Sequence, residues 1–370
     1  MGDYAAAKRH AEAAVYFYLW EVDDSALHGD ALNNRGLANK HLGLWDVAQR
    51  DFADALSAFT GAKDPLRSLR TAQNLATLLK KMGRISEAES MCREGFHLST
   101  DLRMPVLACR YALELGNISV IRRDAAECRR QVATAEAIAR DKGYARERVL
   151  ATEIRGDSLL AAGDARGALE AYMAGLDLGR RLGVGGDVEV ELLRRAAQAC
   201  LSLGKTAEAR PFVEKALSLA QSMQDAYEYA ACLRVLGEIE ISEGMEGNGI
   251  EDLRKSVAEL SRLSLWSHEL AVSEVALGKA LAGRRDRLDR AGALEHLFVA
   301  RRIFSSMGIS SAIREVDEAI SAMDRMEVRT RSGAARGKSI EQPGDLKGGI
   351  DLGAFGIVTC DGRILGDLAR

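Results

Sequence analysis

Residues 43–55 read GLWDVAQRDFADA, and the spacing of small and large side chains in this stretch returns along most of the chain. Gly43 is followed by Ala48, Phe52 and Ala55, which places one bulky residue between two small ones on the same helical face. The glycine position advances in steps of 40 or 41 residues, through Gly43, Gly83, Arg123, Gly163, Gly204 and Gly244. Because several positions advance together, the pattern is a true internal repeat.

Each repeat is predicted to form two antiparallel helices. A small residue lies seven positions before each turn and lets the first helix approach its partner closely, at Gly36, Ala76, Gly116, Gly156, Ala197, Gly237 and, one repeat further on, Gly278. The glycine of the turn can adopt the left-handed conformation that ends a helix. We expect the bulky position of the second helix to fill the space between the pair, with Phe52, Cys92, Val132, Tyr172, Val213 and Leu253.

The pattern resembles the tetratricopeptide repeat. Leu-Gly in the first helix (Leu115-Gly116, Leu236-Gly237), Gly-Asp in the turn (Gly163-Asp164) and Ala-aromatic-Ala in the second helix match that family's consensus. The resemblance implies an all-α, right-handed superhelical solenoid of antiparallel helix pairs. The family's usual period is 34 residues, so the 40-residue period predicts longer helices, mostly the second of each pair. HEAT-type repeats, with a period near 40, are the alternative, and the glycine turn favours the tetratricopeptide reading.

Composition sets wide bounds on function. The 370 residues are 47% hydrophobic and 28% charged, with a net charge of -3, which gives no signal for nucleic acid or membrane binding. No apolar run approaches the length of a membrane-spanning helix, and no signal segment is visible, so a cytoplasmic location is predicted. The six cysteines form no C-x-x-C pair and are expected to act as small apolar residues.

A groove is the site that the resemblance implies, because in this family ligands lie across the first helices. The predicted peptide-binding residues are Asn33, Lys40, His41, Arg70, Gln73, Asn74, Lys81, Arg110, Asn117, Arg194 and Arg234. Equivalent positions hold Leu37, Thr77, Glu153, Asp157, Gln198 and Glu238. Side-chain amides can pair with an extended peptide backbone, and Lys40, Arg70, Lys81 and Arg110 would attract an acidic segment. The family's carboxylate clamp is not reproduced, since Leu37 and Glu114 occupy clamp positions. The alternative is that these are ordinary polar surface residues.

No motif points to catalysis, a cofactor or a metal. Gly204-Lys205-Thr206 and Gly337-Lys338-Ser339 lack the first glycine of a phosphate-binding loop. Residues 57–62 (SAFTGA) resemble the loop with which sigma-54 activators grip their sigma factor, but here Gly61 is expected to end a helix before an Asp64-Pro65 turn. The chain is therefore predicted not to be an enzyme.

Three regions are expected. Residues 1–325 form the solenoid, with a half repeat followed by about seven helix pairs, and residues 326–349 form a flexible linker with basic residues between Arg329 and Lys338. Residues 350–370 read as a strand and a helix that begin a further domain. Gly356-Ile357-Val358-Thr359 and Leu368-Ala369-Arg370 resemble the opening of the AAA+ ATPase domain of sigma-54-dependent bacterial activators. Both ends are expected to continue in a longer protein.

The predicted function is a scaffold that binds a protein or peptide in the concave groove. We expect it to be the signal-sensing or regulatory module of a bacterial sigma-54-type transcriptional regulator. Its partner would then be a separate protein or peptide, or its own downstream ATPase domain, with no membrane and no direct nucleic-acid contact from this chain. The alternative is a free-standing adaptor or co-chaperone without a role in transcription.

Overall fold

The computed structural model describes residues 3–20, 22, 24–284 and 287–336, and the chain divides into two compact units, Met1–Met323 and Asp324–Arg370. In the described part, α1 (Tyr4–Trp20) is followed by seven helix pairs and by α16 (Ser310–Arg336). The first helices of the pairs are α2 (Ser25–His41), α4 (Pro65–Lys81), α6 (Pro105–Ile121), α8 (Ala145–Ala161), α10 (Asp187–Ser202), α12 (Ala226–Ser242) and α14 (His268–Gly283). The second helices are α3 (Trp45–Gly61), α5 (Ile85–Asp101), α7 (Ala125–Lys142), α9 (Ala165–Leu182), α11 (Thr206–Met223), α13 (Glu246–Leu263) and α15 (Arg287–Met307).

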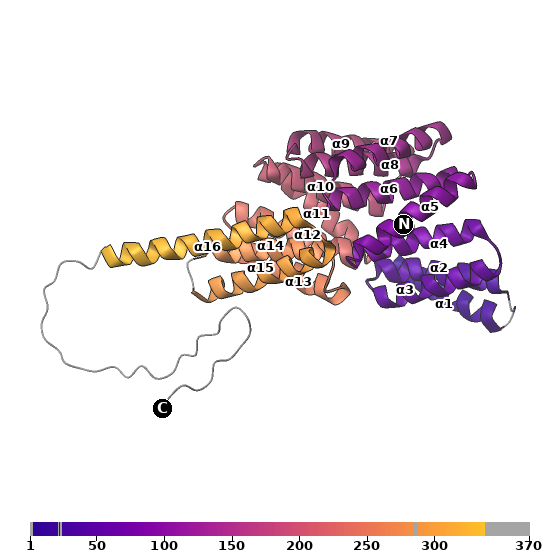
Figure 1. Cartoon of the computed structure of the whole chain (residues 1–370), viewed down its shortest axis with the longest axis horizontal. Coiled ribbons are helices and arrows are strands. Elements are labelled where there is room, and N and C mark those ends of the chain that lie inside the picture. Colours follow the sequence, from indigo (N-terminus) through magenta and orange to yellow (C-terminus); the bar gives the residue numbers. More distant parts are fainter. Residues whose placement is uncertain (1–2, 21, 23, 285–286, 337–370) are drawn as a thin grey trace, which may run out of the picture. The chain divides into compact units, whose positions relative to one another are not determined.

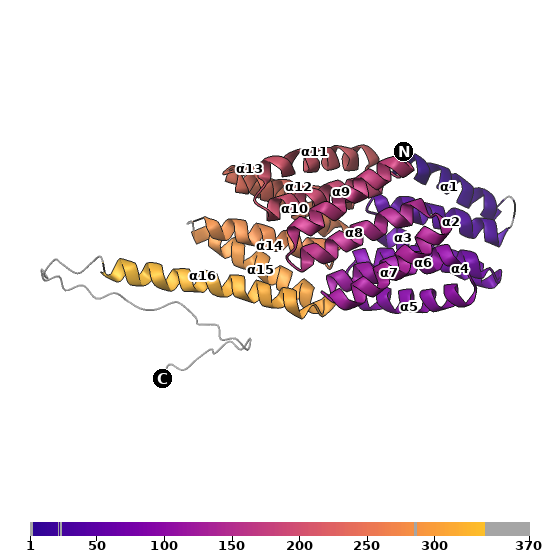
Figure 2. The ribbon, with the colours of Figure 1, turned by 90° about the horizontal axis from the view of Figure 1, so that it is seen from above.

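The helices of the first unit form two layers, and neighbours run antiparallel (Figures 1 and 2). Each even-numbered helix from α2 to α12 contacts the next even-numbered helix as well as its odd-numbered neighbours. The even-numbered helices therefore form the inner layer, and the odd-numbered helices cover them. The predicted all-α solenoid of antiparallel helix pairs is confirmed, with no strand in the described residues.

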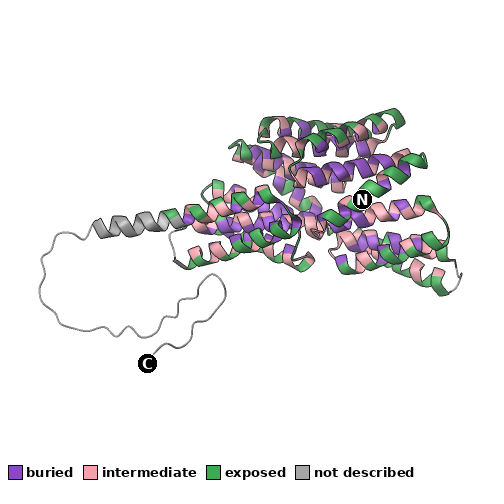
Figure 3. Cartoon of the chain, viewed as in Figure 1, coloured by how far each residue is buried: buried purple, intermediate pink, exposed green. Residues whose placement is uncertain are grey.

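The packing follows the repeated small and large positions. The bulky residues of the second helices are all buried, from Phe52 in α3 to Leu253 in α13. A side chain on Gly156 of α8 would come within 2.4 Å of the Tyr172 ring of α9, so the small position is what allows this pair to close. Figure 3 shows the buried residues (purple) concentrated where helices face one another.

The turns show that the true unit of the chain is about 20 residues, half the sequence repeat. A residue with positive φ follows helix after helix at this spacing, first at Gly43, Lys63, Gly83, Arg103 and Arg123. Gly61 is the last residue of α3, its C-cap is Ala62, and the left-handed conformation is adopted by Lys63, with a φ of 54°. The extra length is also not confined to the second helices, because α2 to α5 all have 17 residues.

The structure also bears on the region predicted to be a linker. α16 continues to Arg336, so residues 326–336 of the predicted linker are helical; this stretch lacks proline and holds several good helix formers. The remainder of the predicted linker and the strand and helix at 350–370 lie outside the described residues.

The five described cysteines are free and buried, as expected for small apolar residues, and Cys360 lies outside the described part. None of the described helices is long and apolar enough to cross a membrane.

Candidate functional site

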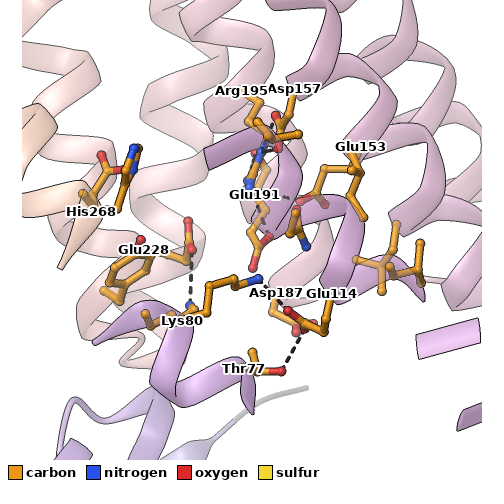
Figure 4. A pocket seen from close by; sticks show the side chains of 18 of the residues that line it. Thr77, Lys80, Glu114, Glu153, Asp157, Asp187, Glu191, Arg195, Glu228 and His268 are labelled. Atoms are coloured by element: carbon orange, nitrogen blue, oxygen red, sulfur yellow. Dashed lines mark hydrogen bonds and ion pairs between the residues drawn. The ribbon is translucent and has the colours of Figure 1, made fainter. Parts of the chain in front are cut away.

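The inner layer of the solenoid encloses one large cavity of about 650 Å³. Its lining comes from all seven first helices, α2 to α14, and from none of the described second helices. Figure 4 shows the charged side chains that project into it. A cavity of this volume is in the range that holds a small molecule or a few residues of peptide.

The cavity is closed on one side because early turns of the solenoid meet late ones. His41 at the end of α2 lies 2.7 Å, Nδ1 to Oδ2, from Asp225, which caps the start of α12. Lys81 at the end of α4 places its Nζ 3.6 Å from Glu228 and 4.1 Å from the centre of the Tyr227 ring.

The same pattern continues at the next two turns. Gly83, after α4, lies against the backbone carbonyl of Trp266 before α14, and Arg123, after α6, pairs with Glu315 of α16. We call this set of contacts the seam, formed by His41, Lys81, Gly83 and Arg123 against Asp225, Tyr227, Glu228, Trp266 and Glu315. It also shares buried apolar residues, since Trp45 and Ile118 belong to the same core cluster as Leu260 and Val316.

Most charges in the cavity are matched in pairs between successive first helices. The shortest N–O distances are 2.7 Å for Lys80–Glu114, 2.7 Å for Arg110–Glu147, 2.6 Å for Arg146–Asp187, 3.0 Å for Arg194–Glu228 and 2.7 Å for Arg234–Glu269. Burial opposes ionisation of Asp187, but the hydrogen bonds and charge of Arg146 outweigh it and bring the pKa of Asp187 down to about 2. These pairs hold neighbouring repeats together and leave little net charge where they lie.

Two places depart from this balance. Lys40 lines the cavity, and its ammonium group has no hydrogen bond or ion pair with any described residue; burial together with the nearby Lys81 lowers its pKa to about 8. Arg195 is shared by three carboxylates, at 3.2 Å from Glu153, 2.9 Å from Asp157 and 3.4 Å from Glu191. The cavity thus has an unmatched cation on α2 and an excess of carboxylates on α8 and α10.

The structure places nine of the eleven predicted groove residues around this one cavity. They are Lys40, His41, Gln73, Asn74, Lys81, Arg110, Asn117, Arg194 and Arg234. Asn33 is instead buried between α2 and α4, where its Oδ1 accepts hydrogen bonds from Thr71 and Asn74. Arg70 pairs with Asp30 of α2 and does not line the cavity. Whether the nine bind a peptide stays a prediction.

The positions also correct the charge expected of the groove. Of the four cations expected to attract an acidic segment, Arg70, Lys81 and Arg110 are paired with carboxylates, and only the ammonium of Lys40 has no ion pair with a described residue. The acidic partners were missed, although they left a signal in the sequence. Carboxylates recur with the repeat period in the first turn of successive first helices, at Glu147, Asp187, Glu228 and Glu269, where they also favour the helix dipole.

Comparison with known proteins shows which repeat and which fold this chain resembles. Residues 191–223 match the sequence model of the tetratricopeptide repeat, a stretch that covers most of α10 and all of α11. No curated protein matches the chain.

Two solved structures resemble it over most of their length. One is a Rap protein complexed with Competence and Sporulation Factor, 12% identical, covering 88% of this chain and 98% of its own, with a TM-score of 0.54. The other is the Rap conjugation gene regulator of plasmid pLS20 in complex with the Phr* peptide, 13% identical, covering 77% and 78%, with a TM-score of 0.52. At this identity the likeness is one of fold. Residues 191–223 thus form a tetratricopeptide repeat, within a chain that has the fold of a tetratricopeptide-repeat solenoid.

Proposed function

We propose that this chain is a peptide-binding scaffold whose ligand occupies the cavity of the inner layer. The observation that carries the proposal is the cavity itself: about 650 Å³, lined by seven helices, with amide and charged side chains facing inward. Gln73, Asn74 and Asn117 supply donors and acceptors for a peptide backbone. The fold of the Rap regulator solved with the Phr* peptide supports this choice of ligand. The proposal assigns the chain a binding role and no reaction.

The test uses an equimolar pool of synthetic pentapeptides. The purified chain is mixed with the pool, passed through a size-exclusion spin column, and the retained peptides are identified by mass spectrometry. We expect a restricted subset to be retained. Asn117→Ala and Asn74→Ala remove one polar contact each, so retention of that subset should fall roughly tenfold, for a contact of about 1.4 kcal/mol.

Arg70→Ala is the matched control, because Arg70 lies on the same helix as Asn74 but does not line the cavity. Its retention should equal that of the wild type. A wild-type protein that retains no peptide above the level of a protein of similar size rejects the proposed function.

We propose further that the scaffold is the sensing module of a bacterial sigma-54-type regulator. The resemblance of Gly356-Ile357-Val358-Thr359 to the start of that ATPase domain supports this role. It requires an ATPase domain encoded directly after Arg370, whose hydrolysis rate responds to the peptide that the pool identifies. A stop codon directly after Arg370 would instead favour the free-standing adaptor.

A further inference from the structure

The excess of carboxylates on α8 and α10 is unusual because one of its members, Glu153, is buried and the other two are only partly exposed. Glu153 is only 2% exposed and Arg195 carries a single positive charge, yet Glu153, Asp157 and Glu191 all lie against that guanidinium. Like charges gathered away from water destabilise a folded protein unless a matching charge is present. The other acidic residues of the cavity in the pairs above each have a cation of their own or share one with a single neighbour.

One carboxylate oxygen in this cluster is unsatisfied. The Oε1 atom of Glu153 forms an ion pair with Arg195. The Oε2 atom of Glu153 is buried and accepts no hydrogen bond from a described residue. Asp157, in contrast, accepts hydrogen bonds from Arg195 and from the hydroxyl of Tyr172 at 2.7 Å. Glu153 lines the cavity (Figure 4), so this buried acceptor lies directly behind the cavity wall. A buried acceptor without a donor destabilises the folded chain, and a bound donor would remove that penalty.

We propose that Glu153, Asp157 and Glu191 form a subsite for an organic cation, a primary ammonium or a guanidinium, carried by the ligand of the cavity. This inference rests on the proposed peptide-binding function and names the chemistry of its ligand. An N–H donor that reaches Glu153 from the cavity satisfies its Oε2 and neutralises part of the excess charge. Arg195 holds the three carboxylates in place but cannot itself match them.

A second charged group of the cavity lining, Lys40, supports the same ligand. Lys40 on α2 is unmatched, and it interacts with Asp187 and Glu114 only over a distance, without a direct ion pair. A cavity with spare negative charge on one wall and a spare positive charge on another favours a ligand that carries both signs. A short peptide with a free amino end and a carboxylate meets that description.

Protonation of the cluster is the competing explanation of its stability. Burial raises the pKa of the Glu153 carboxyl well above its usual value; the charge of Arg195 opposes the shift, while the charges of Glu191 and Asp157 increase it. A protonated Glu153 can also donate a hydrogen bond to Glu191, which raises the pKa of Glu153 and lowers that of Glu191. A Glu153 that is protonated without ligand would give up its proton when a cation arrives. A cation subsite and a protonated Glu153 predict different effects of a neutral substitution at Glu153 on which ligands the cavity prefers.

The experiment repeats the pool measurement with four matched sub-pools. Pentapeptides have either a free or an acetylated amino end, and either lysine or norleucine at one position. Free amino ends and lysine should be retained at least tenfold better than their neutral counterparts, and the two comparisons show whether the cation comes from the chain end or from a side chain. Glu153→Gln and Glu191→Gln should each remove most of this preference.

Glu170→Gln, in the neighbouring helix α9 and outside the cavity, is the matched control and should keep the preference. The unfolding midpoint of Glu153→Gln is measured in parallel and should equal or exceed that of the wild type, because the substitution relieves buried like charge. Peptides retained without regard to positive charge, or a preference that survives both substitutions, would overturn the subsite while the binding function stands. If no peptide is retained by the wild type, the function and the subsite fall together.

Discussion

At the scale of single residues, Lys40 offers a direct readout of the interior of the cavity. Its pKa of about 8 is set by burial and by Lys81, against the attraction of Asp187, Glu114 and Asp225. His41, the next residue, is also partly buried, and its pKa is lowered mainly by that burial and by Lys40. An unfolded chain returns Lys40 to a pKa near 10.4.

The sign of the pH effect follows from this difference. Between pH 8 and about 10.4, the unfolded chain still binds the proton that folded Lys40 has released, so this residue makes the free energy of unfolding rise with pH. Urea titrations of the wild type and of Lys40→Met from pH 7.5 to 10 should show the wild type gaining stability relative to the variant, by at most about 1.4 kcal/mol per pH unit. A difference between the two that stays constant with pH contradicts an unmatched, buried Lys40.

The residue scale also shows what sequence alone can predict of the site. Nine of the predicted groove residues line one cavity because the repeat position fixes which face of a first helix looks inward. Their pairing was not predictable, since Arg194 and Glu228 come from different helices and Lys81 meets Glu228 only where the seam closes. A groove that looked basic in sequence is therefore nearly neutral in the structure.

At the scale of elements, each helix pair depends on a small residue beneath a large one. The sequence predicted these pairs well, because the same position recurs in seven copies and errors in one copy do not matter. The 20-residue spacing of the turns was harder to see, since Lys63 and Arg103 adopt the same positive φ as Gly43 without being glycine. Turn geometry is imposed there by the packed helices on either side rather than by local preference.

Gly156→Ala tests the close approach within the pair of α8 and α9. The new methyl group would lie 2.4 Å from the buried Tyr172 ring, so we expect a loss of about 1–3 kcal/mol in the free energy of unfolding, as for other overpacked cores. Gly247→Ala, in α13 with no atom within 4 Å, is the control and should be neutral or stabilising, because alanine favours helix over glycine. Equal effects of the two substitutions on urea unfolding would mean that the small position is not needed for packing.

At the scale of the whole first unit, the seam determines whether the inner layer encloses a cavity or lies open. An unclosed solenoid has contacts only between neighbouring repeats, whereas here residues more than 180 positions apart touch, as His41 and Asp225 do. The repeat pattern does not predict this closure of the solenoid. The closure depends on the small rotation between successive helix pairs, added up over five pairs. The seam is consequently the feature of the structure that most needs its own test.

Gly83→Ala and Gly163→Ala provide that test, since both glycines occupy the turn after a first helix with nearly the same φ, 83° and 85°. Each alanine costs about 1 kcal/mol for the left-handed conformation. At Gly163 the new methyl group meets no atom within 4 Å, but at Gly83 it would lie 1.8 Å from the carbonyl oxygen of Trp266, across the seam. Gly83→Ala should therefore lose clearly more stability than Gly163→Ala, and it should speed hydrogen exchange in the first turn of α14, near Leu270, where Gly163→Ala does not. A solenoid whose seam is open in solution would show the same stability loss and the same exchange rates for both variants, since neither methyl group would then meet another part of the chain.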